Sequence, residues 1–166
     1  IYGSVSLATQ SRDAALKAAQ LARSAGHHVI FDVNLRPALW PNLEEAKTHI
    51  EAALATATII KVNEIELEFL TGTRDVKKGS QELLTHGAEL CCISLGADGA
   101  FFSTGKVAGH VPAFDVRVKS TVGSGDAFVA GLAFQVRELG QSLESLEHQK
   151  LYDMIRFANA CGAVVA

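Results

Sequence analysis

The chain has 166 residues, 48% hydrophobic and 20% charged, a composition that excludes intrinsic disorder and collagen-like structure. Fifteen lysines and arginines against eighteen aspartates and glutamates give a net charge of −3, so the basic excess that a nucleic-acid partner requires is absent. No apolar run approaches the ~18 residues of a membrane span. The three cysteines lack metal-ligand spacing, and we expect them in the core of a cytoplasmic protein.

Short apolar strands alternate with longer amphipathic helices through the first part of the sequence. The expected elements, in chain order, are a helix over 11–25, a strand over 29–31, a helix over 43–56, a strand over 59–62, a helix over 64–70, a helix over 80–86 and a strand over 90–95. Asn63 has a side chain suited to cap the third helix. Gly26, Gly72 and Gly87 follow helix ends, where glycine is favoured.

The remaining residues predict a hairpin and two long helices. The expected elements are strands over 100–104 and 106–111, a last strand over 116–118, and helices over 126–139 and 147–166. Strands separated by helices indicate βαβ units, and we expect residues 1–166 to form a single α/β domain with a mostly parallel sheet flanked by helices on both faces. Ligands bind such sheets at the carboxyl ends of the strands, so polar residues there are the candidates.

The strongest chemical signal is a glycine-rich turn, Ser120-Thr-Val-Gly123-Ser124-Gly125-Asp126, that runs directly into a helix. Successive backbone N–H groups and the positive end of the helix dipole form a site for a phosphoryl group. A carboxylate at its mouth, that of Asp126, can accept the proton of an attacking hydroxyl. The alternative is that the glycines only form a tight turn and Asp126 only caps the helix.

Two other nucleotide motifs are disfavoured. Phe128 occupies the position of the third glycine in the dinucleotide-binding fingerprint, which argues against a Rossmann oxidoreductase. The stretch from Gly99 to Gly105 and Lys106 has one residue too many for a phosphate-binding P-loop, and Val107 stands where serine or threonine is required.

A second polar cluster is Asp32-Val-Asn34-Leu-Arg36, which follows the strand over 29–31. Alternation along extended backbone places the three polar side chains on one side. A guanidinium beside an amide suits the hydroxyls or a carboxylate of a small polyol. The alternative is a surface turn with an internal ion pair between Asp32 and Arg36.

A third cluster is formed by Asn63 and Glu66, which follow the next strand. Three positions apart on a helix, they share a face and could hold phosphate and metal-bound water together. The alternative is a capping box, in which Glu66 bonds back to the first residue of the helix.

A fourth cluster, Ser94, Gly96 and Gly99, ends the strand over 90–95. Its glycines let a ligand approach the backbone closely, although a plain hairpin turn explains them equally well. The six histidines are scattered without ligand spacing, so we expect no metal site from them.

Taken in this order, the four segments resemble the ribokinase-like, or PfkB, family of carbohydrate kinases over essentially the whole chain. Residues 120–128 are similar to the C-terminal signature of that family. The resemblance implies a ribokinase-like fold and ATP-dependent phosphorylation of a sugar hydroxyl. Residues 31–41 most resemble bacterial fructokinases, whose close relatives phosphorylate aminoimidazole riboside or 2-keto-3-deoxygluconate, and this segment does not separate the three substrates.

The resemblance also implies roles for individual residues. Asp126 would be the general base, and the amides of Gly123, Ser124 and Gly125 would form the anion hole for the γ-phosphoryl group. Asn63 would serve the phosphates of ATP. The implied sugar-facing residues are Arg36, Asn34 and Asp126. The other implied ligands are Glu66 for Mg²⁺ through water, and Ser94, Gly96, Gly99 and Asn159 for ATP, with Asn159 near the adenine.

Two departures from the family pattern limit these expectations. Ser120 stands where the family usually has aspartate, near a position that binds a monovalent cation in many members, so potassium activation is not implied. Family members are considerably longer, and their N-terminal part supplies the lid strands and much of the sugar site. We therefore expect residues 1–166 to be the C-terminal, nucleotide-binding portion of a longer sugar kinase, unable to enclose a sugar alone, and any homodimer to require the full-length protein.

An alternative from another class is a non-catalytic nucleotide-binding module that keeps the fold without a sugar site. Asp126 argues against this alternative, because a protein that only binds nucleotide needs no base beside its anion site.

Overall fold

The centre of the fold is a sheet whose strands lie beside one another in chain order. The computed structural model describes residues 1–139 and 142–166, and within them the sheet has six strands in the order β1-β2-β3-β4-β5-β6. They are β1 (Tyr2–Gly3), β2 (Ile30–Asp32), β3 (Ile59–Asn63), β4 (Leu90–Ser94), β5 (Ala100–Ser103) and β6 (Ala108–Val111). Strands β1 to β4 are parallel, whereas β5 and β6 are each antiparallel to the strand before them. The mostly parallel sheet and the late hairpin are therefore confirmed.

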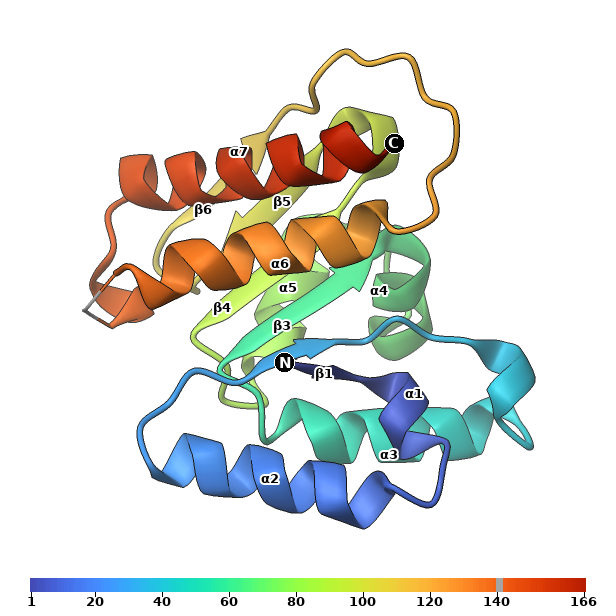
Figure 1. Ribbon diagram of the computed structural model, residues 1–166. Coiled ribbons are helices and arrows are strands. Elements are labelled where there is room, and N and C mark those ends of the chain that lie inside the picture. The colour runs from blue at the N-terminus through green and yellow to red at the C-terminus, as the bar shows by residue number, and fades with distance from the viewer. Residues whose placement is uncertain (140–141) are drawn as a thin grey trace.

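Helices cover both faces of this sheet (Figure 1). They are α1 (Ser4–Leu7), α2 (Arg12–Ser24), α3 (Leu43–Leu54), α4 (Glu64–Thr71), α5 (Val76–Leu84), α6 (Ser124–Arg137) and α7 (His148–Val165), with short 3-10 turns η1 (Pro37–Leu39), η2 (Gly96–Asp98) and η3 (Leu143–Ser145). Buried residues of α6 and α7 pack on one face, and those of α1, α3, α4 and α5 on the other. Among the helices of the described ranges, none combines the length and apolarity needed to cross a bilayer.

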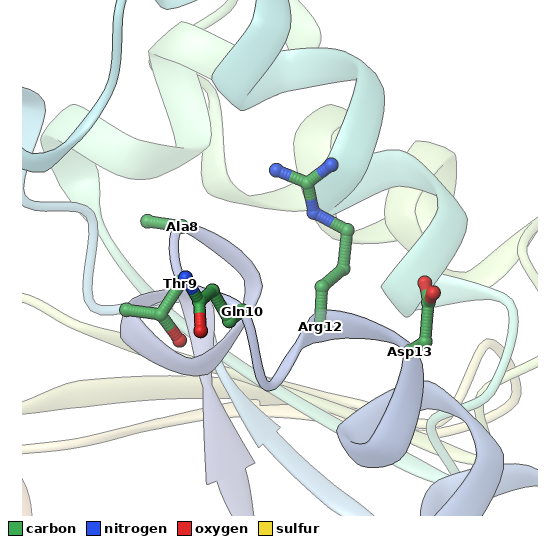
Figure 2. A pocket seen from close by; sticks show the side chains of 5 residues that line it. All are labelled: Ala8, Thr9, Gln10, Arg12 and Asp13. Carbon is green, nitrogen blue, oxygen red and sulfur yellow. The ribbon is translucent and has the colours of Figure 1, made fainter.

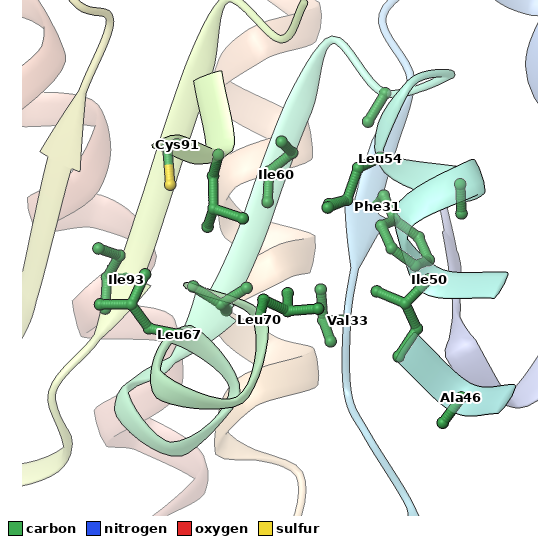
Figure 3. Packing of buried hydrophobic residues seen from close by; sticks show 14 of the residues in the cluster. Phe31, Val33, Ala46, Ile50, Leu54, Ile60, Leu67, Leu70, Cys91 and Ile93 are labelled. Atoms are coloured by element: carbon green, nitrogen blue, oxygen red, sulfur yellow. The ribbon is translucent and has the colours of Figure 1, made fainter. Parts of the chain in front are cut away.

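Alternation along the strands separates the buried side chains into two cores. Figure 3 shows Ile60, Cys91 and Ile93 among the side chains of the core that the helices α3, α4 and α5 cover. Their chain neighbours Ile59 and Cys92 belong to the other core, beneath α6 and α7. Because successive side chains of a strand point to opposite faces, a strand covered on both faces must be apolar at every position. This requirement explains the continuous apolar runs in the sequence.

Two of the three cysteines occupy the core as predicted. Cys91 and Cys92 are fully buried in β4. Cys161 departs from the prediction because it is partly exposed. It lies on α7 at the contact with α6, where a Cβ added to Gly131 would lie 2.8 Å from its Sγ atom. The glycine lets the two helices approach closely beside this thiol.

The beginning of the chain and the start of α5 differ from the prediction. The strand β1 and the helix α1 span two and four residues, too few to show a hydrophobic period. Helix α5 begins at Val76 rather than at residue 80, because Asp75 caps it: Oδ1 of Asp75 accepts N–H bonds from Lys77 at 2.9 Å and Lys78 at 3.1 Å. An aspartate before the helix was the signal available in the sequence.

The strand predicted over 116–118 is wrong, because this segment is irregular. Val116 and Val118 are 40% and 57% exposed, so no layer of the fold covers them. The backbone bonds to a helix end instead of a strand: the N–H groups of Lys119 and Ser120 donate to the carbonyl of Ala166 at 2.7 and 3.0 Å. Alternating valines alone do not form a strand without a neighbouring strand to pair with.

Leu132→Ala should lower the free energy of unfolding by about 2–5 kcal/mol, because Leu132 is fully buried between α6 and the sheet and its loss leaves a cavity. Arg137→Ala on the same helix is the control, since the Arg137 side chain is 83% exposed and its removal should change stability by about 0.5 kcal/mol or less. Urea unfolding measures both values. Equal losses in the two variants would contradict the packing described for α6.

Candidate active site

The polar residues singled out in the sequence gather where the parallel strands end. Asp32, Asn63 and Ser94 are the last residues of β2, β3 and β4. In Figure 1 the arrowhead of β3 points toward the N-terminal end of α6 and toward α4. The carboxyl ends of a parallel sheet are where α/β proteins bind their ligands.

A pocket of about 290 Å³ opens at this edge and contains the predicted base. The lining includes Asp126 of α6, Asp32 at the end of β2, Asn34 just after this strand and Gly3 of β1. The structure thus brings Asp126 and Asn34 into one pocket, as the predicted base and sugar-facing residue require. Arg36 is exposed and lies outside the lining.

The glycine turn forms the start of α6 as predicted, but the helix begins at Ser124, two residues earlier than expected. Gly123 precedes it in the left-handed conformation, with φ of 87°. The N–H of Ser124 donates to the carbonyl of Thr121 at 3.3 Å. The N–H groups of Gly123, Gly125 and Asp126 have no acceptor among the described residues, so they are free to bind an anion.

Two further oxygens belong to this turn. The hydroxyl of Ser124 is buried without a hydrogen-bond partner in the described part of the chain, which fits a site that a polar ligand completes. Oγ of Ser120 accepts the N–H of Val122 at 3.2 Å. That contact supports the backbone before the turn, and the effect of Ser120 on potassium dependence stays a prediction.

Asp32 forms a buried ion pair that the sequence analysis did not predict. Nζ of Lys61 lies 3.1 Å from Oδ1 of Asp32, and both residues are less than one-tenth exposed. Asp32 thus pairs with Lys61 and not with Arg36, the partner that the alternative interpretation of this segment offered. Burial raises the pKa of Asp32, the nearby charge of Asp126 adds to this, and the cations of Lys61 and Arg36 oppose it. A lysine within an otherwise apolar strand was the signal in the sequence.

Gly3 of β1 was also missed. A Cβ added to it would lie 2.8 Å from the carbonyl oxygen of Asp32, so only glycine fits beside the end of β2. The strand that carries it is too short to be predicted, and no pattern in the sequence marks this glycine.

Asn63 and Glu66 form the capping box that was the alternative prediction for them. Oδ1 of Asn63 accepts the N–H of Glu66 at 2.9 Å, and Oε2 of Glu66 accepts the N–H of Asn63 at 2.8 Å. Oε1 of Glu66 accepts a third bond, from the N–H of Leu35 at 2.9 Å, and so links α4 to the segment after β2. Burial raises the pKa of Glu66, while these backbone bonds and the charge of Lys61 oppose the rise.

The capping box bears on the predicted magnesium site. Both oxygens of Glu66 already accept backbone N–H groups, and no cluster of three or more His, Cys, Asp or Glu side chains suited to a metal occurs within the described ranges. The residues present therefore do not form a direct metal site, and the role of Glu66 toward Mg²⁺ through water stays a prediction.

The residues predicted to bind ATP lie along the neighbouring strand ends. Ser94 is paired in register with Asn63, and its hydroxyl donates to the carbonyl of Val62 at 3.3 Å. Gly96 begins η2 and Gly99 follows it in the turn to β5, and both have positive φ. This geometry matches the hairpin-turn alternative, and ATP binding here stays a prediction.

Asn159 reaches the same region from α7. Its Nδ2 donates to the carbonyls of Val111 at 3.1 Å and Pro112 at 3.3 Å, and so holds the segment that leaves β6. The structure places Asn159 beside this segment, and its role near the adenine stays a prediction.

Asn34 has an unusual backbone conformation in the pocket. It is the one residue other than glycine with positive φ, 39°, among the described residues. Its carbonyl accepts the hydroxyl of Ser4 at 3.1 Å, so α1 holds this conformation. Asparagine tolerates the left-handed region better than most residues.

A larger hollow of about 450 Å³ lies elsewhere, at the residues that connect α1 to α2. Figure 2 shows its lining, which contains none of the predicted site residues: Ala8, Thr9, Gln10, Arg12 and Asp13. Arg12 is already engaged, since its Nε donates to the carbonyl of Leu7 at 2.6 Å. The pocket at Asp126 is therefore the candidate site.

Comparison with known proteins agrees with this fold and site. The family model described as pfkB family carbohydrate kinase matches residues 1–166, and the chain belongs to that family. Fructokinase-1 of Oryza sativa subsp. japonica is 43% identical over 168 residues, which cover 99% of this chain and 51% of that relative. The chain thus spans about half the length of the curated relatives it matches.

Two solved structures confirm the ribokinase-like α/β fold. Aminoimidazole riboside kinase from Salmonella enterica, complexed with aminoimidazole riboside and an ATP analog, has a TM-score of 0.87 and 38% identity, and the match covers 99% of this chain and 55% of that one. Fructokinase from Vibrio cholerae O395, in a form bound to fructose, ADP and calcium ion, has a TM-score of 0.89 and 32% identity, with coverage of 99% and 53%.

Replacing Glu66 by glutamine should produce a pH-dependent change in stability. Because the folded pKa of Glu66 is raised, the wild-type protein should lose stability as the pH rises from about 4.5 through the folded pKa, whereas glutamine does not titrate. The free energy of unfolding of the wild type minus that of Glu66→Gln should therefore decrease over this window and then stay constant. Urea unfolding at a series of pH values measures it.

Glu51→Gln on the exposed surface of α3 is the control, and its difference from the wild type should stay flat over the same window. A difference for Glu66→Gln that increased with pH would show that the two backbone N–H bonds outweigh burial at this carboxylate.

Proposed function

We propose that this chain is the nucleotide-binding and catalytic portion of an ATP-dependent carbohydrate kinase. The observation that carries the proposal is the position of Asp126. It lines a pocket together with Asn34, and it lies on the first turn of a helix whose N–H donors have no acceptor among the described residues. A base and an anion site within one helical turn are what phosphoryl transfer to a hydroxyl requires.

In the proposed reaction, Asp126 accepts the proton of a sugar hydroxyl while the hydroxyl oxygen attacks the γ-phosphorus of ATP and the bond to ADP breaks. The N–H groups of Gly123, Gly125 and Asp126 stabilise the charge of the transferred group. Mg²⁺, when bound, neutralises charge on the phosphate oxygens. Asn63 and Glu66 would lie nearest the phosphates and the metal-bound water.

The remaining predicted contacts divide between the two substrates. Asn34, with Arg36 on the same segment, would face the sugar, and the nucleotide would lie along the ends of β3 and β4. The nucleotide contacts in this proposal are Ser94, Gly96, Gly99 and Asn159.

Fructose is the sugar we favour. The support is the 43% identity to a plant fructokinase and the likeness to a fructokinase bound to fructose and ADP. Aminoimidazole riboside is the second candidate, because the kinase from Salmonella enterica is 38% identical and was solved with that compound. The same family also makes 2-keto-3-deoxygluconate a candidate.

Sugar-dependent ADP release by the complete gene product, measured with fructose, aminoimidazole riboside and 2-keto-3-deoxygluconate in parallel, should be fastest with fructose. A faster rate with another of the three would support the proposed kinase activity and identify a different substrate. ATP binding without release of ADP in any reaction would favour a non-catalytic nucleotide-binding module.

Asp126→Asn should lower kcat by about 10²- to 10⁴-fold, the usual contribution of a general base, while KM for both substrates changes little. Glu138→Gln is the matched control, because Glu138 is an exposed carboxylate at the other end of the same helix and should leave kcat unchanged. Steady-state kinetics at saturating ATP give both values. A variant at Asp126 that kept wild-type turnover would remove this residue from the mechanism.

A further inference from the structure

A buried lysine lies beneath the proposed phosphoryl site. Lys61 is 5% exposed and stands in a row of paired residues that crosses the sheet from Gly3 through Asp32 and Lys61 to Cys92. Cys92 belongs to the core under α6 and α7, so alternation places the Lys61 side chain on that apolar side. An ammonium group there loses its hydration, and the carboxylate of Asp32 is its ion-pair partner.

The ammonium lies directly under the first turn of α6. A Cβ added to Gly125 would be 3.4 Å from Nζ of Lys61, and among the described residues no other atom outside Ser124, Asp126 and the backbone of this helix comes within 4 Å of that point. The carboxylate of Asp32 is therefore farther from this position than the ammonium is. The ion pair presents its positive end to the turn.

An anion bound at the turn would interact favourably with this ammonium. The start of a helix carries partial positive charge, so a cation beneath it meets charge of the same sign. Lys61 interacts with the carboxylates of Asp32 on β2 and Glu66 on α4, and the charges of Asp126 on α6 and Arg36 also act on Asp32. Nζ of Lys61 and Oδ1 of Asp32 are 3.1 Å apart, so the carboxylate holds the ammonium at this position.

We propose that Lys61 is a positioning residue of the phosphoryl site, held by Asp32 beneath Gly125 so that its charge adds to that of the N–H groups that receive the phosphoryl group of a nucleoside triphosphate. The proposal rests on the proposed kinase function. Lys61 acts through the turn and does not touch the substrate, because it is buried. Its effect should be larger on a ligand with a γ-phosphoryl group than on one without it.

A purely structural ion pair is the rival explanation, and a double-mutant cycle separates the two. Removing one partner of a buried pair leaves an uncompensated charge, so Lys61→Gln and Asp32→Asn should each lower the melting temperature. Replacing both together should restore much of the stability under either explanation. The two explanations differ in what the restored double variant does with nucleotide.

The test uses the complete gene product and compares the affinity for a non-hydrolysable ATP analogue with the affinity for ADP, both by calorimetry. For the double variant Lys61→Gln/Asp32→Asn we expect a melting temperature near that of the wild type, and a ratio of the two affinities lowered about tenfold or more. A second double variant, Lys61→Met/Asp32→Val, gives an apolar pair if the polar one folds poorly. Arg74→Gln/Glu68→Gln is the control, because it removes an exposed ion pair of 2.8 Å.

A stable double variant with the wild-type ratio of affinities would overturn the proposal and leave the pair a structural one. A wild-type protein that binds the ATP analogue but phosphorylates no sugar would contradict the proposed function alone, and the ratio would still decide the role of Lys61. A wild-type protein that binds neither nucleotide would overturn both.

Discussion

The register of the parallel strands determines where the candidate site lies. Backbone pairing sets Gly3 beside Asp32 and Asp32 beside Lys61, and a slip of one residue would turn each of these side chains to the opposite face. Apolar residues on both faces prevent such a slip, because either core would then receive charged groups. The packing of the two cores thus holds the charges of the site beneath the N-terminal end of α6.

Much of this arrangement could be predicted from the sequence, because the relevant signals are local. The apolar runs, the glycine at the start of α6 and the polar residues after each strand are all readable from neighbouring positions. The fold class was predicted on these grounds, and the comparisons agree with it. The resemblance to the carbohydrate kinases, not a local signal, implied that Asp126 and Asn34 act together, and one pocket contains both residues.

What the sequence did not reveal depends on contacts between distant segments. Lys61 of β3 pairs with Asp32 of β2, which lies 29 positions earlier in the sequence. Glu66 accepts a hydrogen bond from Leu35, which lies 31 positions earlier. The valines at 116 and 118 illustrate the opposite error: they alternate like a strand, but no strand lies beside them. Glu66 was predicted either as a helix cap or as a site residue. It is a cap, and its bond to Leu35 also connects α4 to the segment after β2.

Asn34 has a consequence for how this protein could change its specificity. Its side chain lines the pocket, while its backbone is held at positive φ, a region that β-branched and bulky residues avoid. A replacement at this position must therefore tolerate the positive φ and must also fit the ligand. In the proposed sugar site, evolution toward a different substrate therefore has few acceptable replacements at this position, chiefly glycine, aspartate and histidine, and larger changes in recognition must arise at neighbouring positions with ordinary backbone angles.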